Sequence, residues 1–136
     1  MESKKLVLPY VEGLDNAASL EEFSSKAKCK AINVCNATAA TKVATLNWPD
    51  DFPYCPECNV RAAWCDKGLG ILYNVKGLDL RALAMSDNGS VWQDSCCEFF
   101  VSDPCDGTYY NFEMNCIGTL LVSKRKSRED CVHYTA

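Results

Sequence analysis

The sequence predicts an all-β protein, an antiparallel β-sandwich with one short N-terminal helix. Apolar runs that alternate with polar residues recur roughly every 8–15 residues, and clusters of turn-forming residues separate them. About seven such runs can be counted, against one helical pattern. Apolar residues make up 48% of the chain and charged residues 24%, an ordinary balance for a protein with a packed core.

The length of 136 residues predicts one domain spanning residues 1–136. The net charge of −4 argues against nucleic acid and anionic membranes as partners. All apolar runs are far shorter than a membrane span. The apolar part of the N-terminus is also too short for a signal peptide, so we expect a cytoplasmic chain, or an extracellular one if the true N-terminus is missing.

The N-terminal part of the chain contains the helical pattern. Residues 1–12 hold a short apolar run that predicts an edge strand or a lead-in. Ser19 and Glu22 fit a capping box, and apolar residues follow at helical spacing, which predicts a short helix over about residues 20–28. The Ala- and Thr-rich segment 36–46 is compatible with helix, strand or loop, and it stays unassigned.

A loop and a hairpin follow. Two prolines and two aspartates exclude regular structure from residues 47–54. The runs 60–65 and 69–75 alternate with period two and flank an Asp-Lys-Gly turn, which predicts a β-hairpin. We expect three aromatic side chains to pin the preceding loop onto the core: Trp48, Phe52 and Tyr54.

Two aromatic-rich runs, 91–101 and 109–119, hold carboxylates and amides among apolar neighbours, and a turn-rich loop joins them. They predict two adjacent strands whose side chains alternate between two faces. In the first run, one side holds Cys97, Phe99 and Val101, and the other Cys96, Glu98 and Phe100. In the second run, the apolar side holds Tyr110, Phe112, Met114 and Cys116, and the polar side Tyr109, Asn111, Glu113 and Asn115.

The remaining charged residues are expected at turns and junctions. Asp94, next to Ser95, is expected to cap backbone amides where the loop enters the strand. Asp103 and Asp106 stand beside proline and glycine, which predicts a turn, with calcium binding as the alternative. The charged segment 124–130 predicts a solvated turn, and another strand begins after it.

Ten cysteines are unusual for a chain of this length. We favour mostly reduced thiols, because the chain shows no export signal and is long enough to build a core without disulfides. Cys65, Cys97 and Cys116 also occupy strand positions that suit a small hydrophobe. The CxxC of Cys55 and Cys58 is half of a zinc ribbon, but a second CxxC is missing and the residues after it predict a strand.

Three functional interpretations remain open for the two aromatic-rich runs. The first is an ordinary solvated hairpin. The second is a sugar-binding face, because the Trp92 indole beside carboxylates and amides suits the C–H faces and hydroxyls of a pyranose. The third is a glycoside hydrolase that uses Glu98 and Glu113, since adjacent strands can place carboxyl groups at the roughly 5–9 Å separation of glycosidases. That chemistry also needs a deep cleft and different environments for the two groups.

Two further candidates come from the remaining functional groups. A thiol- or zinc-dependent interaction module is the alternative suggested by the CxxC, although the sequence favours no metal ligand set. The single histidine, His133, has no catalytic partner that the sequence identifies, so it is interpreted as a surface or core residue.

The segment from Trp92 to Phe100 (WQDSCCEFF) and the segment from Tyr109 to Thr119 (YYNFEMNCIGT) resemble the central signature of family 9 carbohydrate-binding module-like domains. They are most similar to the bacterial branch, with its W-x-D-S-x-x-E-F-F and Y-Y-N-F-E-x-N-x-x-G-T patterns. The Asn47-Trp48-Pro49 and Arg81-Ala82 segments fit the same branch. The resemblance covers roughly residues 45–134.

This resemblance implies a non-catalytic β-sandwich that binds saccharides without a cofactor, often attached to enzymes that degrade plant polysaccharides. It implies that Trp92 forms half of an aromatic clamp and that Glu98 bonds to sugar hydroxyls. The positions of Glu113, Asn115 and Arg81 match further polar contacts, although sugar-binding members have Arg where this chain has Glu113. The second clamp Trp belongs to a C-terminal portion that this chain lacks, so we expect a truncated domain that self-associates through an open sheet edge.

Overall fold

The computed structural model describes residues 7–12, 14, 38–102 and 104–134. The chain divides into two compact units, residues 1–77 and residues 78–136. The described residues form seven β-strands and one short 3₁₀ helix, and both sheets are antiparallel. The all-β prediction is therefore confirmed. The predicted helix at 20–28 lies outside the described residues, and the packing of the sheets as a sandwich stays a prediction.

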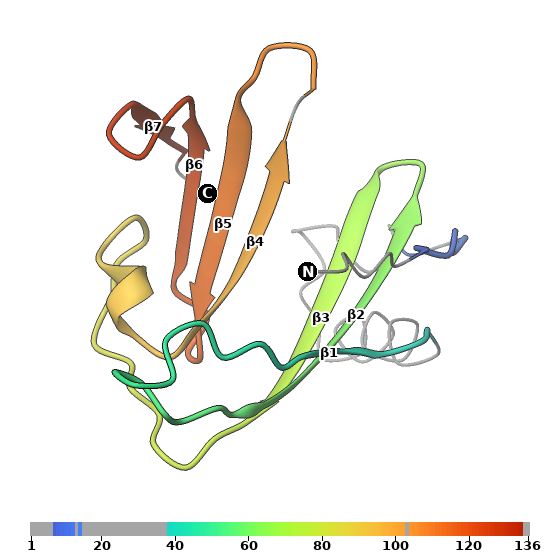
Figure 1. Ribbon diagram of the computed structural model, residues 1–136. Helices are drawn as coiled ribbons and strands as arrows, with labels where there is room; N and C mark the ends of the chain where they lie inside the picture. Colours follow the sequence, from blue (N-terminus) through green and yellow to red (C-terminus); the bar gives the residue numbers. More distant parts are fainter. Residues whose placement is uncertain (1–6, 13, 15–37, 103, 135–136) are drawn as a thin grey trace. The chain divides into compact units, whose positions relative to one another are not determined.

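The first unit contains a three-stranded sheet in the order β1-β2-β3 (Figure 1). The strands are β1 (Thr41–Val43), β2 (Glu57–Cys65) and β3 (Gly68–Lys76). The predicted hairpin is confirmed, with its turn at residues 66–67 and Cys65 paired with Gly68. The N-terminal run joins this sheet, because the Trp64 N–H donates to the Pro9 carbonyl at 3.0 Å.

A small apolar cluster anchors the first unit. Leu14, Ala63 and Cys65 are buried in it, so Cys65 acts as the expected small hydrophobe. The loop at 47–54 lacks regular strands, as predicted. Its aromatic side chains do not pin it, however, because each of the three is at least half exposed: Trp48, Phe52 and Tyr54. Exposed prolines and aspartates around them keep this loop in contact with solvent.

The second unit contains a four-stranded sheet in the order β4-β5-β6-β7, in which every strand pairs with its neighbour in the sequence (Figure 1). A 3₁₀ helix, η3 (Val91–Gln93), precedes the sheet. The strands are β4 (Cys96–Ser102), β5 (Tyr109–Asn115), β6 (Leu120–Arg125) and β7 (Cys131–His133). The two aromatic-rich runs are thus adjacent strands, as predicted.

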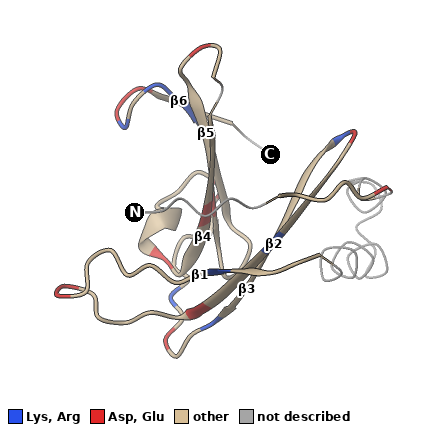
Figure 2. Ribbon diagram, turned by 45° about the vertical axis from the view of Figure 1, so that its right-hand side comes forward, with Lys and Arg blue, Asp and Glu red and all other residues tan. Residues whose placement is uncertain are grey.

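The turns of this unit also follow the sequence. Asp106 accepts hydrogen bonds from the backbone N–H and the hydroxyl of Thr108. It also forms an ion pair with Lys124, with 3.0 Å between the Lys124 Nζ and the Asp106 Oδ2. The Thr108 hydroxyl, followed by its backbone N–H and Lys124, lowers the pKa of Asp106 to about 2. Asp106 is therefore a turn residue, while Asp103 lies outside the described residues. The tip between β6 and β7 is exposed and presents charges of both signs (Figure 2).

The burial of the two faces of β5 is a finding that the sequence pattern did not predict. Residues alternate between the faces as expected, but the polar side is the buried one: Asn111 is 3% exposed and Glu113 5%. The apolar Phe112 and Met114 are 37% and 46% exposed. The polar side of β5 is therefore the covered one. Burial of the polar side is possible because Asn111 and Glu113 hydrogen bond to each other.

The cysteines of the second unit do not all lie in strands. Cys116 lies after β5 and is exposed, so it is not the strand hydrophobe that the sequence predicted. No disulfide joins any two of the eight cysteines among the described residues. None of the helices in the described part of the chain has both the length and the apolar character of a membrane span.

Candidate functional site

Asp94 holds the loop that leads into η3 and β4. Its carboxylate accepts hydrogen bonds from the backbone N–H of Leu83 at 3.0 Å and of Ala84 at 2.9 Å. Arg81 adds an ion pair, with 3.6 Å between its Nε and the Asp94 Oδ1. The side chain of Asp94 is only 1% exposed. The prediction that Asp94 caps backbone amides is confirmed.

These contacts keep Asp94 ionised. The hydrogen bond from Leu83 is the largest cause of a lowered pKa, and burial opposes it. Hydrogen bonds from Ala84 and Asn115 and the charge of Arg81 lower the pKa further. The negative charge of Asp94 is therefore compensated within the loop.

Asn115 uses all of its side-chain hydrogen-bonding capacity in the same junction. Its amide N–H groups donate to the Ala84 carbonyl and to Asp94, both at 3.0 Å. Its oxygen accepts from the backbone N–H of Ile117 at 3.2 Å and of Thr119 at 2.8 Å. An amide side chain offers two donors and two acceptor positions, so none is left for a ligand. The structure thus gives Asn115 a positioning role in place of the expected sugar contact.

The loop is fixed along β6 as well. Asn88 has a left-handed backbone with φ of 59°, a conformation that Asn tolerates better than most residues. Its N–H donates to the Leu120 carbonyl at 2.9 Å, and its side-chain oxygen accepts from Val122 at 3.1 Å. Asp87 accepts from the Leu120 N–H at 2.9 Å. The loop therefore occupies the part of the β6 edge that β7 does not reach.

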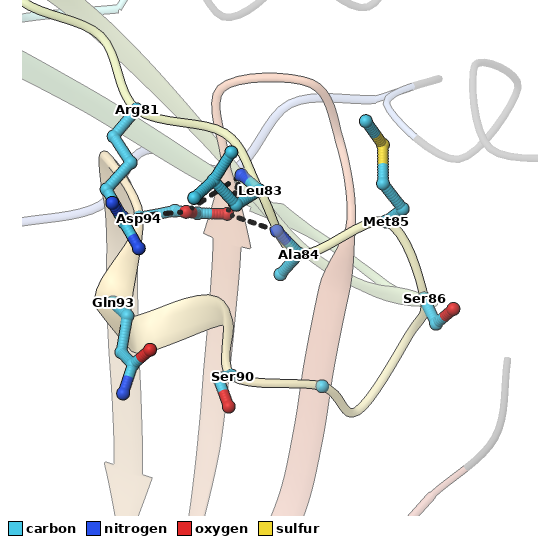
Figure 3. A pocket seen from close by; sticks show the side chains of 9 residues that line it. Arg81, Leu83, Ala84, Met85, Ser86, Ser90, Gln93 and Asp94 are labelled. Carbon is cyan, nitrogen blue, oxygen red and sulfur yellow. Dashed lines mark hydrogen bonds and ion pairs between the residues drawn. The ribbon is translucent and has the colours of Figure 1, made fainter.

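The segment 81–94 encloses an open pocket of about 440 Å³ (Figure 3). Arg81, Gln93 and Ser90 line one side of it, and Met85 and Ser86 line the other. The Arg81 guanidinium lies beside Asp94 and reaches toward Gln93 in this view. The sequence predicted Arg81 as a site residue, but not the remaining lining residues, because their approach depends on the loop contacts of Asp94 and Asn88.

Trp92 lies in η3, directly before β4. Its neighbour Val91 is completely buried and anchors the turn, while Trp92 itself is 54% exposed. The indole therefore lies at the surface, and a platform for a sugar ring has to be exposed in this way.

Glu98 and Glu113 face each other across β4 and β5. They are directly paired in the antiparallel register, so their side chains project from the same face of the sheet. Glu98 is exposed, whereas Glu113 is 5% exposed. The Asn111 amide donates to Glu113 Oε1 at 2.7 Å. The other oxygen of Glu113 and the Asn111 oxygen are buried and lack a hydrogen-bond partner among the described residues.

The environment of β4 changes the titration of Glu98 and of its neighbour Cys96. Burial, and then the charge of Glu113, raises the pKa of Glu98. The Cys96 thiol donates to Glu98 Oε1 at 3.6 Å. Burial, followed by Glu98, raises the pKa of Cys96 to about 12, so this thiol is protonated at neutral pH.

The alternative functions receive less support from this geometry. A glycosidase needs both carboxyl groups in reach of the substrate, yet Glu113 is nearly inaccessible. The CxxC overlaps the start of β2, and burial raises the pKa of Cys58. Within residues 7–12, 14, 38–102 and 104–134, no three His, Cys, Asp or Glu side chains are arranged to hold a metal ion.

One contact was missed at the sequence level. Cys131 Sγ lies 3.7 Å from His133 Nε2 on β7, so the histidine does have a thiol neighbour. The sequence did indicate this contact, because two residues that are two positions apart on a strand have their side chains on the same face.

The site residues thus form two groups within the second unit. Arg81 and Asn115 meet through Asp94 at the loop junction. Glu98 and Glu113 meet across β4 and β5. Trp92 lies between Arg81 and Glu98 in the sequence, directly before β4, and is exposed.

Comparisons with known proteins show which family the chain belongs to. The sequence model of carbohydrate-binding family 9 matches residues 28–135. A solved structure of a proposed carbohydrate-binding protein from Bacteroides uniformis ATCC 8492 is 38% identical, with a TM-score of 0.68. The match covers 81% of this chain and 50% of the other, so the chain spans about half the length of that protein. A search of the curated proteins found no match. The resemblance seen in the sequence is confirmed: the chain belongs to carbohydrate-binding family 9.

Proposed function

We propose that this chain binds oligo- or polysaccharides of the plant type without catalysing their conversion, as part of carbohydrate catabolism. Trp92 supplies an aromatic platform, Glu98 accepts hydrogen bonds from sugar hydroxyls, and Glu113 supports Glu98 from the neighbouring strand. Arg81 contributes from the loop. A catalytic partner, either attached or separate, degrades the polysaccharide.

The observation that supports this proposal best is the pairing of Glu98 with Glu113 on one face of the sheet, next in sequence to an exposed tryptophan. Two like charges placed opposite each other destabilise a sheet. A ligand whose hydroxyl groups donate hydrogen bonds to Glu98 would offset this repulsion, which gives the pair a role in binding. An exposed indole beside acceptor oxygens is the usual chemistry of pyranose recognition.

Isothermal titration calorimetry with xylo- and cello-oligosaccharides tests the proposal. We expect saturable binding that Trp92→Ala abolishes and Glu98→Gln weakens, while circular dichroism shows both variants to be folded. Trp48→Ala is the matched control, since Trp48 is also exposed but lies in the loop at 47–54. Unchanged binding in Trp92→Ala, or its loss in Trp48→Ala, would overturn the assignment of the platform.

The facing carboxylates also permit a specific check of the hydrolase alternative. A retaining glycosidase places its two carboxyl groups about 5 Å apart, which paired strand positions can reach. Turnover of an aryl glycoside that Glu98→Gln removes would replace the binding proposal with an enzymatic one. We expect no turnover, because Glu113 is buried and does not line the pocket at 81–94.

A further inference from the structure

The pocket at 81–94 is rich in hydrogen-bond donors that the protein does not use. Arg81 contacts Asp94 through Nε, and its two η nitrogens make no hydrogen bond to any described residue. The Ser90 hydroxyl makes no capping hydrogen bond at η3. Within the described part of the chain, no hydrogen bond occupies the side chains of Ser86 or Gln93 either. Figure 3 shows Arg81, Gln93 and Ser90 along the same side of the pocket.

The acidic residue of this pocket does not compete with these donors. Asp94 accepts hydrogen bonds from Leu83, Ala84 and Asn115, and its side chain is 1% exposed. These hydrogen bonds stabilise the Asp94 charge more than Arg81 does. The ion pair of 3.6 Å then orients the guanidinium, whose side chain is 56% exposed. The pocket therefore presents one oriented cation and neutral donors to solvent.

We propose that this pocket binds the carboxylate of an acidic sugar, so that the preferred ligands contain uronic acid residues. The inference rests on the proposed function, because it assigns the class of saccharide that the module recognises. A guanidinium presents its N–H groups as a planar fork that matches the two oxygens of a carboxylate. Gln93 and Ser90 add donors for the same group or for neighbouring sugar oxygens. The volume of about 440 Å³ suits a small ligand moiety.

Because the chain as a whole is acidic, a preference for an acidic ligand would point to this site. A net charge of −4 does not attract acidic ligands at long range. Any preference for an acidic sugar must therefore come from a local cation. It should also weaken as salt is added, since the pocket is open to solvent.

Calorimetry with paired ligands tests the inference. Xylotriose and xylotriose with a glucuronic acid substituent differ in one carboxylate-bearing group. We expect wild-type protein to bind the acidic ligand about tenfold tighter or more, as a charge-assisted bidentate contact allows. Arg81→Gln should abolish this preference, so that the ratio of the two affinities falls to about one. Arg81→Lys, which keeps the charge but not the fork, should retain part of it.

Arg128→Gln provides the matched control. It removes the same charge from the exposed tip between β6 and β7, where the backbone carbonyl of Arg128 accepts a hydrogen bond from Arg125. The preference for the acidic ligand should be unchanged in this variant. If Arg81→Gln does not fold, Arg81→Lys is compared with wild type instead. An unchanged preference for the acidic ligand in Arg81→Lys would contradict a bidentate contact between the guanidinium and the carboxylate.

The outcomes separate this inference from the proposed function. If neutral and acidic xylotriose bind equally, saccharide binding stands and the uronate assignment is rejected. If neither ligand binds, both proposals fail. Acetate and lactate form a third arm: binding as tight as that of the acidic sugar would show a general anion site and would reject the sugar assignment.

Discussion

At the scale of single residues, Asn115 and Asp94 show how a loop acquires a defined shape. One amide and one carboxylate satisfy backbone groups from four separate positions around the start of β4 and the end of β5. Both side chains are almost fully buried, so each hydrogen bond lies in a medium where an unsatisfied group is costly. The position of the Arg81 guanidinium depends on these two residues.

Asn115→Ala should destabilise the protein markedly. The substitution removes hydrogen bonds to Ala84, Asp94, Ile117 and Thr119, and each buried group left unsatisfied costs roughly 1–3 kcal/mol. Urea unfolding followed by fluorescence measures the loss in the free energy of unfolding. In the control Asn59→Ala, a hydrogen bond to Glu57 on the sheet surface is lost, and a change within about 0.5 kcal/mol is expected. Equal effects of the two substitutions would argue against the junction described for Asn115.

At the scale of elements, the β4–β5 pair combines a destabilising contact with a functional one. Glu98 and Glu113 are directly paired, and the pKa of Glu98 is raised by burial and by Glu113. The folded state therefore holds the Glu98 proton more tightly than the unfolded chain does. Stability from this group is fully present below the ordinary Glu value of 4.5 and is lost as pH rises through the higher folded pKa.

Glu98→Gln should consequently stabilise the protein at neutral pH while it weakens sugar binding. The gain should be at most about 1 kcal/mol, because Glu98 is exposed and solvent screens the repulsion. The gain should vanish as pH falls below the ordinary Glu value of 4.5, where Glu98 is protonated in both the folded and the unfolded state. Thermal unfolding at pH 4 and pH 7 measures both values. Glu57→Gln is the control, since Glu57 lies 3.9 Å from Lys76 and should gain nothing. A variant that is less stable at pH 7 would contradict repulsion between the paired strands.

The free edge of the four-stranded sheet is the second feature at this scale. β4 pairs only with β5 among the described strands, and it exposes Phe100 by 53% and Val101 by 42%. Such an edge can pair with another copy of the chain, and a lysine on an edge strand opposes that pairing. We expect concentration-dependent association in analytical ultracentrifugation that Val101→Lys reduces. Association that persists unchanged in Val101→Lys would place the contact elsewhere.

At the scale of the whole chain, the sequence predicted strand order better than it predicted which surfaces are covered. The hairpins and the turn at Asp106 depend on neighbours in the sequence, and both are confirmed. The capping role of Asp94 is confirmed as well, although its partners Leu83 and Ala84 lie in the preceding loop. A period of two says that two faces differ, but not which face is buried. The burial of Glu113 could therefore not be predicted.

The candidate site was predictable to a similar extent. The facing carboxylates follow from strand pairing, and the exposure of Trp92 agrees with the expectation. The pocket residues Gln93, Ser86 and Ser90 were missed, because they approach Arg81 only when Asp94 and Asn88 fold the loop. Polar residues in a loop give no periodic signal, so tertiary contacts alone bring such donors together.

The most direct test of the account is a ¹⁵N-resolved NMR titration with xylo-oligosaccharide, since it reports each residue separately. We predict saturable shifts of the Trp92 indole N–H and of the backbone amides around Glu98 and Glu113. The indole signals of Trp48 and Trp64 should stay unchanged. Shifts confined to residues 38–77, or no shift at millimolar sugar, would contradict saccharide binding at this face.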